Sequence, residues 1–102
     1  MKLIEMLCEM VDEEIEDAEK YAKCALKYKA DNPALSKTFY DLSTDELRHM
    51  MLLHGEVTGA IQKYRQEHGE PPAEMKAIYD YLHEKQIKKA AEVKRLQDMY
   101  RE

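Results

Sequence analysis

Glu46 and His49 are the two residues whose types and spacing best fit metal chemistry in this sequence. They stand three positions apart in the segment Leu42–His54. On an α-helix, side chains three residues apart project from the same face. A carboxylate oxygen and an imidazole nitrogen on one face suit iron or manganese as ligands. The pair therefore predicts a metal site, to which a helix packed alongside would have to add a further acidic residue.

The pair interrupts an apolar stripe that recurs at steps of three and four, as one face of a helix does. The apolar members of the stripe are Leu35, Phe39, Leu42, Met50, Leu53, Val57, Ile61 and Tyr64. Position 46 falls on this stripe and position 49 lies beside Met50, so polar groups stand where the pattern indicates core. Because an unpaired buried charge is too costly to keep, such groups need a partner, and a bound metal ion is one.

Three long helices are expected, at residues 2–30, 33–68 and 72–100. Asn32 and Pro33 are typical of a helix start, and Gly69 is typical of a helix end. The first helix carries a regular stripe, a spacing typical of helices that pack along their length. That stripe is Ile4, Cys8, Val11, Ile15, Ala18, Ala22 and Ala25. The sequence therefore predicts one all-α domain, residues 1–102, of three long antiparallel helices.

Two features complicate this reading. Ser43–Glu46 also fits a capping box, in which Glu46 would serve only the start of a separate helix. The unbroken phase of the apolar stripe favours one continuous helix instead. The stripe of the third helix is interrupted at Gln86 and Lys89, so its packing is expected to be less complete. Its apolar members are Met75, Ile78, Leu82, Ala90, Val93, Leu96 and Tyr100.

Composition and charge exclude several classes of function. The chain has 102 residues and a net charge of −5, which argues against a general nucleic-acid binder because phosphate binding needs a basic surface. No apolar run is long enough to span a membrane. The N-terminus has no signal-peptide core, so a cytoplasmic protein is expected. Cys8 and Cys24 would lie about 24 Å apart on one helix and are expected to stay reduced.

Residues 12–57 resemble the first helix pair of rubrerythrin and other ferritin-like proteins. The shared features are Glu14 seven residues before Tyr21, then Pro33, then Phe39 seven residues before Glu46, and then Glu46-Leu47-Arg48-His49. Members of that family usually carry two such halves in one chain, whereas this chain carries one. In this respect it is similar to the encapsulated ferritins, in which each short chain supplies a half-site and a dimer completes the di-iron centre.

The resemblance implies that two chains bring Glu14, Glu46 and His49 together across a two-fold axis. The implied assembly is a homodimer, or a ring of dimers, in which the first two helices of each chain form a ferritin-like four-helix bundle. It would bind two iron ions, or manganese, and would act as a ferroxidase or remove peroxide. No catalytic group beyond the metal ligands is implied. On the first helix, Glu13 and Asp17 remain alternatives to Glu14 as the ligand.

A metal-free helical interaction protein, such as an adaptor, is the alternative from a different class. In that case Glu46 is a surface or capping residue and His49 is a satisfied histidine at the edge of the core. The interrupted stripe of the third helix favours this view, because it calls for a partner. His54 is expected to be partly exposed and His83 to be solvated. Gly55 and Gly59, four residues apart, would be explained by a helix packed closely on their face.

Overall fold

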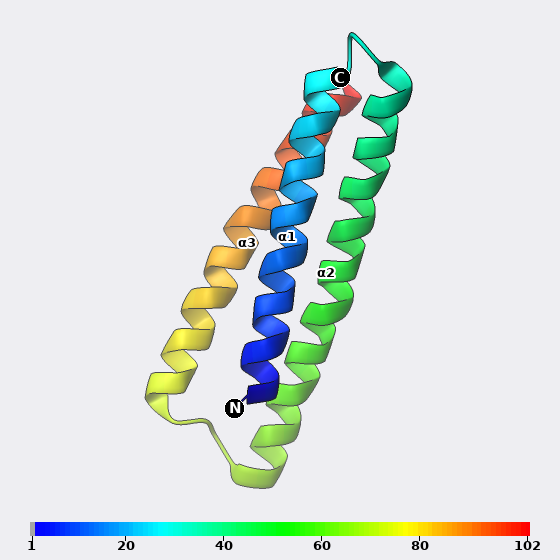
Figure 1. Cartoon of the computed structure of the whole chain (residues 1–102). Helices are drawn as coiled ribbons and strands as arrows, with labels where there is room; N and C mark the ends of the chain where they lie inside the picture. The colour runs from blue at the N-terminus through cyan, green and yellow to red at the C-terminus, as the bar shows by residue number, and fades with distance from the viewer. Residues whose placement is uncertain (1) are drawn as a thin grey trace.

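A central helix, α1 (Lys2–Tyr28), lies between α2 (Pro33–His68) and α3 (Ala73–Arg101) in the computed structural model, which describes residues 2–102 (Figure 1). Successive helices run in opposite directions, so α1 and α3 are parallel to each other (Figure 1). α1 packs closely against both neighbours, whereas the backbones of α2 and α3 lie farther apart and are joined mainly through side chains. The molecule is a rod of 55 × 18 × 18 Å. The expected all-α fold of three long helices is confirmed, with no strand among residues 2–102.

The helix ends follow from local chemistry. α1 ends at Tyr28, two residues earlier than expected, because the chain turns there and the Asn32 N–H donates to the Tyr28 carbonyl at 2.9 Å. The Asn32 side chain then caps α2 by accepting the Leu35 N–H at 3.2 Å. Gly69 ends α2 with a positive φ of 78°, a conformation that glycine adopts without the steric cost of a Cβ.

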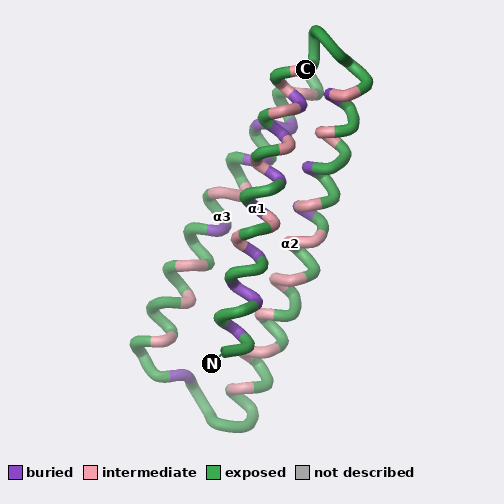
Figure 2. The backbone as a smooth tube through the Cα atoms, viewed as in Figure 1, coloured by how far each residue is buried: buried purple, intermediate pink, exposed green. Residues whose placement is uncertain are grey.

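The core is built around α1. All seven residues of its predicted stripe are buried, and Figure 2 shows buried positions along its whole length. Burial of a fully enclosed aliphatic side chain contributes about 1.5–3 kcal/mol. α1 has helices on two sides, which is why its stripe is enclosed in a single chain. The central cluster consists of Val11, Ile15, Ala18, Leu47 and Val93.

The apolar stripe predicted for α2 does not form its buried face. The buried residues of α2 are Ser36, Ser43 and Leu47, while Phe39 is half-buried and Leu42 is 37% exposed. α2 has only α1 as a close neighbour, so the strip it buries is narrow, and small serines let the two backbones approach. The predicted stripe therefore lies at the boundary of the core in the single chain, where Met50, Leu53 and Val57 pack against the central cluster.

Ser43 joins all three helices. Its hydroxyl donates to the Ala18 carbonyl of α1 at 2.6 Å and accepts from Nε2 of Gln97 on α3 at 2.9 Å. Ser36 makes a similar bond to the Ala25 carbonyl. Ser43 thus lies within a continuous α2 and faces the other helices, so the capping-box reading of Ser43–Glu46 is wrong.

α3 buries the face that its apolar pattern indicated, most completely in its second half, where Val93 and Leu96 are buried. Gln86, which the sequence marked as an interruption, is buried and donates to Oδ1 of Asp12 at 3.0 Å. Ile78, a member of the predicted stripe, is 56% exposed. Polar contacts to α1 thus replace apolar packing along part of α3. Within residues 2–102, no helix has the length and hydropathy needed to cross a bilayer.

Candidate metal centre

An aromatic contact marks the register in which Glu14 of α1 lies level with Glu46 of α2. Tyr21 lies seven residues after Glu14, and Phe39 lies seven residues before Glu46. The two rings stack with centroids 6.2 Å apart. Because the helices are antiparallel, two turns back along α1 and two turns forward along α2 lead from this contact to the same level. There the two carboxylates meet.

Glu14, Glu46 and His49 converge to the spacing of ligands around one ion. Each offers a ligand atom, and the three atoms lie within 4.8 Å of one another. His49 Nδ1 lies 3.6 Å from Glu14 Oε2 and 3.8 Å from Glu46 Oε2. Metal–ligand bonds of about 2.0–2.2 Å hold neighbouring ligand atoms roughly 3–4 Å apart. The cluster therefore fits a metal ion without a large rearrangement.

One oxygen of this cluster has no hydrogen-bond partner. Glu14 Oε2 is buried, yet no donor within the described residues reaches it. The three side chains are only partly exposed, at 26% for Glu14, 19% for Glu46 and 44% for His49. A buried carboxylate oxygen without a partner costs free energy. A cation at this point would satisfy that oxygen, so these three side chains suit a metal ion as ligands.

The two carboxyl groups also disturb each other's ionisation. The pKa of Glu46 is raised, first by a hydrogen bond that its protonated form makes to Glu14, then by burial and by the Glu14 charge. His49 acts in the opposite direction. Two carboxylates this close repel each other unless a proton or a cation lies between them. The electrostatics of the site therefore favour a positive charge between the two carboxyl groups, either a shared proton or a bound cation.

Of the three acids considered on α1, the structure brings Glu14 to Glu46 and His49. Glu13 and Asp17 are exposed, and neither belongs to the three-residue cluster found among residues 2–102. Glu14 is held inward because it lies beside Val11 and Ala18, three residues before it and four after it. These apolar neighbours distinguish Glu14 from the acidic residues around it, a distinction that sequence spacing alone did not make.

The cluster lies on the side of the α1–α2 pair away from α3, which we call the open face. Ser43 and Met50, three residues before and four after Glu46, pack toward α3 or the core. His49, three residues after Glu46, and Leu42, four residues before it, lie on the opposite side of Glu46. Met10 is 41% exposed and lies one turn before Glu14. The open face comprises Leu3, Met10, Glu14, Leu42, Glu46 and His49.

The sequence did not indicate a second group, the pair His54 and His83. Nε2 of His54 on α2 lies 3.1 Å from Nε2 of His83 on α3. His54 is half-buried as expected, and His83 is exposed but hydrogen-bonded. The two residues are 29 positions apart on different helices, so only the packing of α3 brings them together. No local spacing signal was present.

Comparison of the chain with protein-family models, curated proteins and solved structures found no match. The chain is thus a three-helix all-α protein with a cluster of two glutamates and one histidine. The resemblance to ferritin-like proteins rests on sequence features alone, namely Glu14, Tyr21, Pro33, Phe39 and the segment Glu46–His49.

Proposed function

We propose that this chain is a ferritin-like protein that binds iron, or alternatively manganese, in a site completed by a second copy of the chain. The observation that carries the proposal is the cluster of Glu14, Glu46 and His49, in which a buried carboxylate oxygen lacks a partner. An arrangement that leaves such an oxygen unsatisfied is costly unless it serves a ligand. Carboxylate and imidazole donors together suit iron and manganese.

A second copy would supply what one chain lacks. One chain offers three protein ligands on an open face. The exposed apolar side chains of that face are Met10 and Leu42, one turn from the ligands, and Leu3, three turns before Glu14 along α1. A two-fold axis through this face would pack these side chains against the same surface of the other copy. It would also oppose two glutamates with two glutamates, whose four charges two divalent ions would neutralise. The dimer therefore explains both the exposed apolar groups and the incomplete ligand set.

Within such a site the residues have separate roles. His49 in its neutral form would bind through Nδ1, the ring nitrogen that faces both carboxylates. Glu14 and Glu46 would hold and bridge the ions, which keeps the two ions close. Fe(II) is then the substrate, and each Fe(II) would give one electron to O2 or to peroxide. The proposed activity is therefore ferroxidase or peroxide-removing.

Anaerobic titration of the purified protein with Fe(II) tests the proposal. We expect saturation at about one Fe(II) per chain, since a two-fold site shares two ions between two chains. His49→Ala and Glu46→Ala should weaken binding by more than about tenfold, the loss that even an outer-shell change causes. His68→Ala is the matched control, because His68 is an exposed histidine of the same helix. Binding by all the variants at the affinity of the parent chain would refute the proposal.

A metal-free interaction protein is the second candidate, favoured by exposed apolar residues away from the open face. Met51 is 66% exposed, and Ile87 on α3 is 55% exposed. The substitution Glu46→Leu separates the two candidates. An interaction protein without metal would keep or gain stability, because apolar groups often replace buried polar groups at no cost. A metal protein would lose its stabilisation by added metal.

A further inference from the structure

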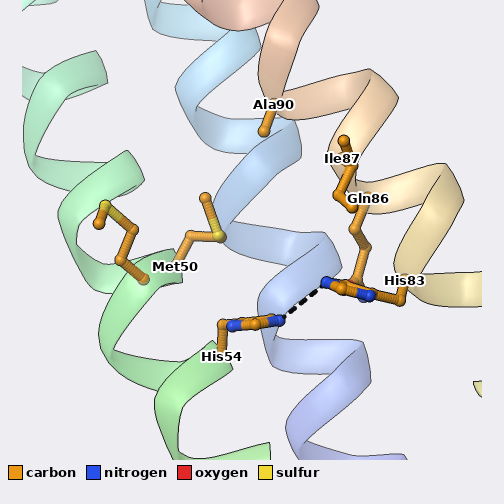
Figure 3. Close-up of a pocket in the computed structure, with 7 residues that line it drawn as sticks. Met50, His54, His83, Gln86, Ile87 and Ala90 are labelled. Carbon is orange, nitrogen blue, oxygen red and sulfur yellow. Dashed lines mark hydrogen bonds between the residues drawn. The ribbon is translucent and has the colours of Figure 1, made fainter. Parts of the chain in front are cut away.

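A pocket lies between α2 and α3 where their backbones are apart and side chains meet across the gap. It has a volume of about 230 Å³ and opens to solvent. Figure 3 shows His54 and His83 reaching across it, with their nitrogens facing each other. The residues that line the pocket are Met50, Met51, His54, His83, Gln86, Ile87 and Ala90. Two imidazoles and two thioethers thus share one largely apolar space.

The two histidines have the spacing of a ligand pair. Their Nε2 atoms are 3.1 Å apart, and their rings stack with centroids 4.9 Å apart at an angle of 23°. Two nitrogens at about 2.0–2.1 Å from one ion lie roughly 3.3–3.4 Å apart when the bond angle is tetrahedral, so the two rings need to separate by only a few tenths of an ångström. Without an ion, one ring donates its N–H to the other. A metal would replace that single proton as the link between α2 and α3.

The donor set selects the kind of metal. Within residues 2–102, no third histidine, cysteine or acidic residue joins the two imidazoles in a cluster of ligand spacing. A zinc site would therefore lack its usual third protein ligand. The remaining donors of the pocket are the side-chain amide oxygen of Gln86 and the sulfur atoms of Met50 and Met51. Thioether sulfur favours Cu(I), and imidazole also suits copper.

We propose that His54 and His83, with a thioether of the same pocket, form a Cu(I) site between α2 and α3. The site is separate from the Glu14 cluster, because it uses neither Glu46 nor His49 and draws on α3. It also gives a role to two histidines that the iron site leaves unused. Cu(I) bound there would add a metal link between α2 and α3 to the side-chain contacts at Ser43 and Tyr40 that already join the two helices.

Anaerobic titration with Cu(I) against a chromophoric chelator tests this site on the full chain. We expect about one tightly bound Cu(I) per chain, with affinity falling by more than about tenfold in His54→Ala and in His83→Ala. His68→Ala is the matched control and should bind as the parent chain does. His49→Ala should also bind Cu(I) normally, so that failure of the copper site and failure of the iron site give different results. Unchanged affinity in both pocket variants overturns the proposal.

X-ray absorption of the Cu(I)-loaded parent protein gives a second test that needs no variant to fold. The expected signature is two nitrogen neighbours and one sulfur neighbour at the copper. Met50→Leu and Met51→Leu then identify the thioether, since the substitution at the ligand removes the sulfur signal. A spectrum without nitrogen neighbours, or without sulfur, contradicts the site as proposed.

Discussion

Glu14 Oε2 lies 3.6 Å from Nδ1 of His49, buried and without a hydrogen-bond donor. The two residues belong to different helices, and their approach depends on the register that the stacked rings of Tyr21 and Phe39 mark. A neutral histidine carries no positive charge in either tautomer, so it leaves the negative charge of Glu46 beside that of Glu14 uncompensated. The arrangement of the three side chains therefore suits a bound cation better than it suits hydrogen bonds within the cluster.

A first prediction is that metal stabilises the folded chain. Mn(II), which resists oxidation, should raise the melting temperature, because an ion that binds only the folded state adds about 2.7 kcal/mol at a concentration of 100 times its Kd. Thermal unfolding followed by circular dichroism measures the shift, and added chelator should reverse it. Glu46→Leu should show no shift with Mn(II). A shift that persists in Glu46→Leu would mean that Mn(II) binds somewhere else.

A second prediction concerns the metal-free protein and pH. The pKa of Glu46 is raised above its ordinary value of 4.5 by Glu14 and by burial. The folded state therefore holds this proton more tightly than the unfolded state, and stability falls as pH rises from 4.5 through the higher folded pKa. Glu46→Gln removes the titrating group, so it should be the more stable chain at neutral pH and should not lose this contribution.

Urea unfolding at several pH values measures the effect, with metal removed by chelator. The parent chain minus Glu46→Gln gives the contribution of this one carboxyl group, since the other ionisable groups are common to both. Glu13→Gln is the control, because Glu13 is exposed on α1 and lies outside the cluster. If the difference between the parent and Glu46→Gln does not change with pH, the carboxyl pair does not interact as described.

A third prediction concerns the open face. Leu42→Glu should prevent dimerisation and weaken Fe(II) binding together, because Leu42 lies one turn before Glu46 on the proposed interface. Met51→Glu, at a residue that is 66% exposed and lines the pocket between α2 and α3, should leave both properties unchanged. Sedimentation velocity with and without Mn(II) measures the oligomer. A parent chain that stays monomeric while it binds iron would contradict the shared site.

The sequence predicted the helices well but predicted the buried faces unevenly. The stripe of α1 is buried as expected, because α1 has a neighbour on each side. The stripe of α2 is only half-buried, because hydrophobic periodicity shows that a face is apolar but not whether the same chain covers it. Ser36 and Ser43 are buried instead, a placement that depends on backbone approach and hydrogen bonds to α1.

The candidate site was predictable in part for a similar reason. Glu46 and His49 are separated by three residues on one helix, so sequence spacing alone places them together. The choice of Glu14 over Asp17 depends on the rotation and register of α1 against α2, which the sequence constrains to within one turn. The pair His54 and His83 had no such signal, because its members come from helices whose packing is set by Gln86, Gln97 and their partners.

A fourth prediction concerns the glycines of α2. A Cβ added at Gly55 or Gly59 would meet nothing within 4 Å, so the expected close helix neighbour is absent from the described residues of the single chain. Alanine should therefore stabilise the helix by about 1 kcal/mol at each position. Urea unfolding of Gly55→Ala and Gly59→Ala measures this gain. A loss of stability or of dimerisation would instead show that a second copy packs on this face.

A fifth prediction concerns the hydrogen-bond chain that joins the three helices. Ser43→Ala removes the oxygen that accepts from Gln97 and donates to the Ala18 carbonyl. It leaves the buried Gln97 amide without this partner, which costs about 1–3 kcal/mol. Urea unfolding measures the loss, and amide hydrogen exchange should show faster opening of α3 near Gln97.

Two further variants decide whether this loss comes from the buried bond. Thr38→Ala is the control, because Thr38 is exposed and its hydroxyl bonds only to the Ala34 carbonyl of its own helix. Its effect should stay within about 0.5 kcal/mol. Adding Gln97→Leu to Ser43→Ala should recover part of the stability, since removing both partners leaves no unsatisfied donor. If the double variant is less stable than the sum of the single losses, apolar packing rather than the hydrogen bond holds α3 at this point.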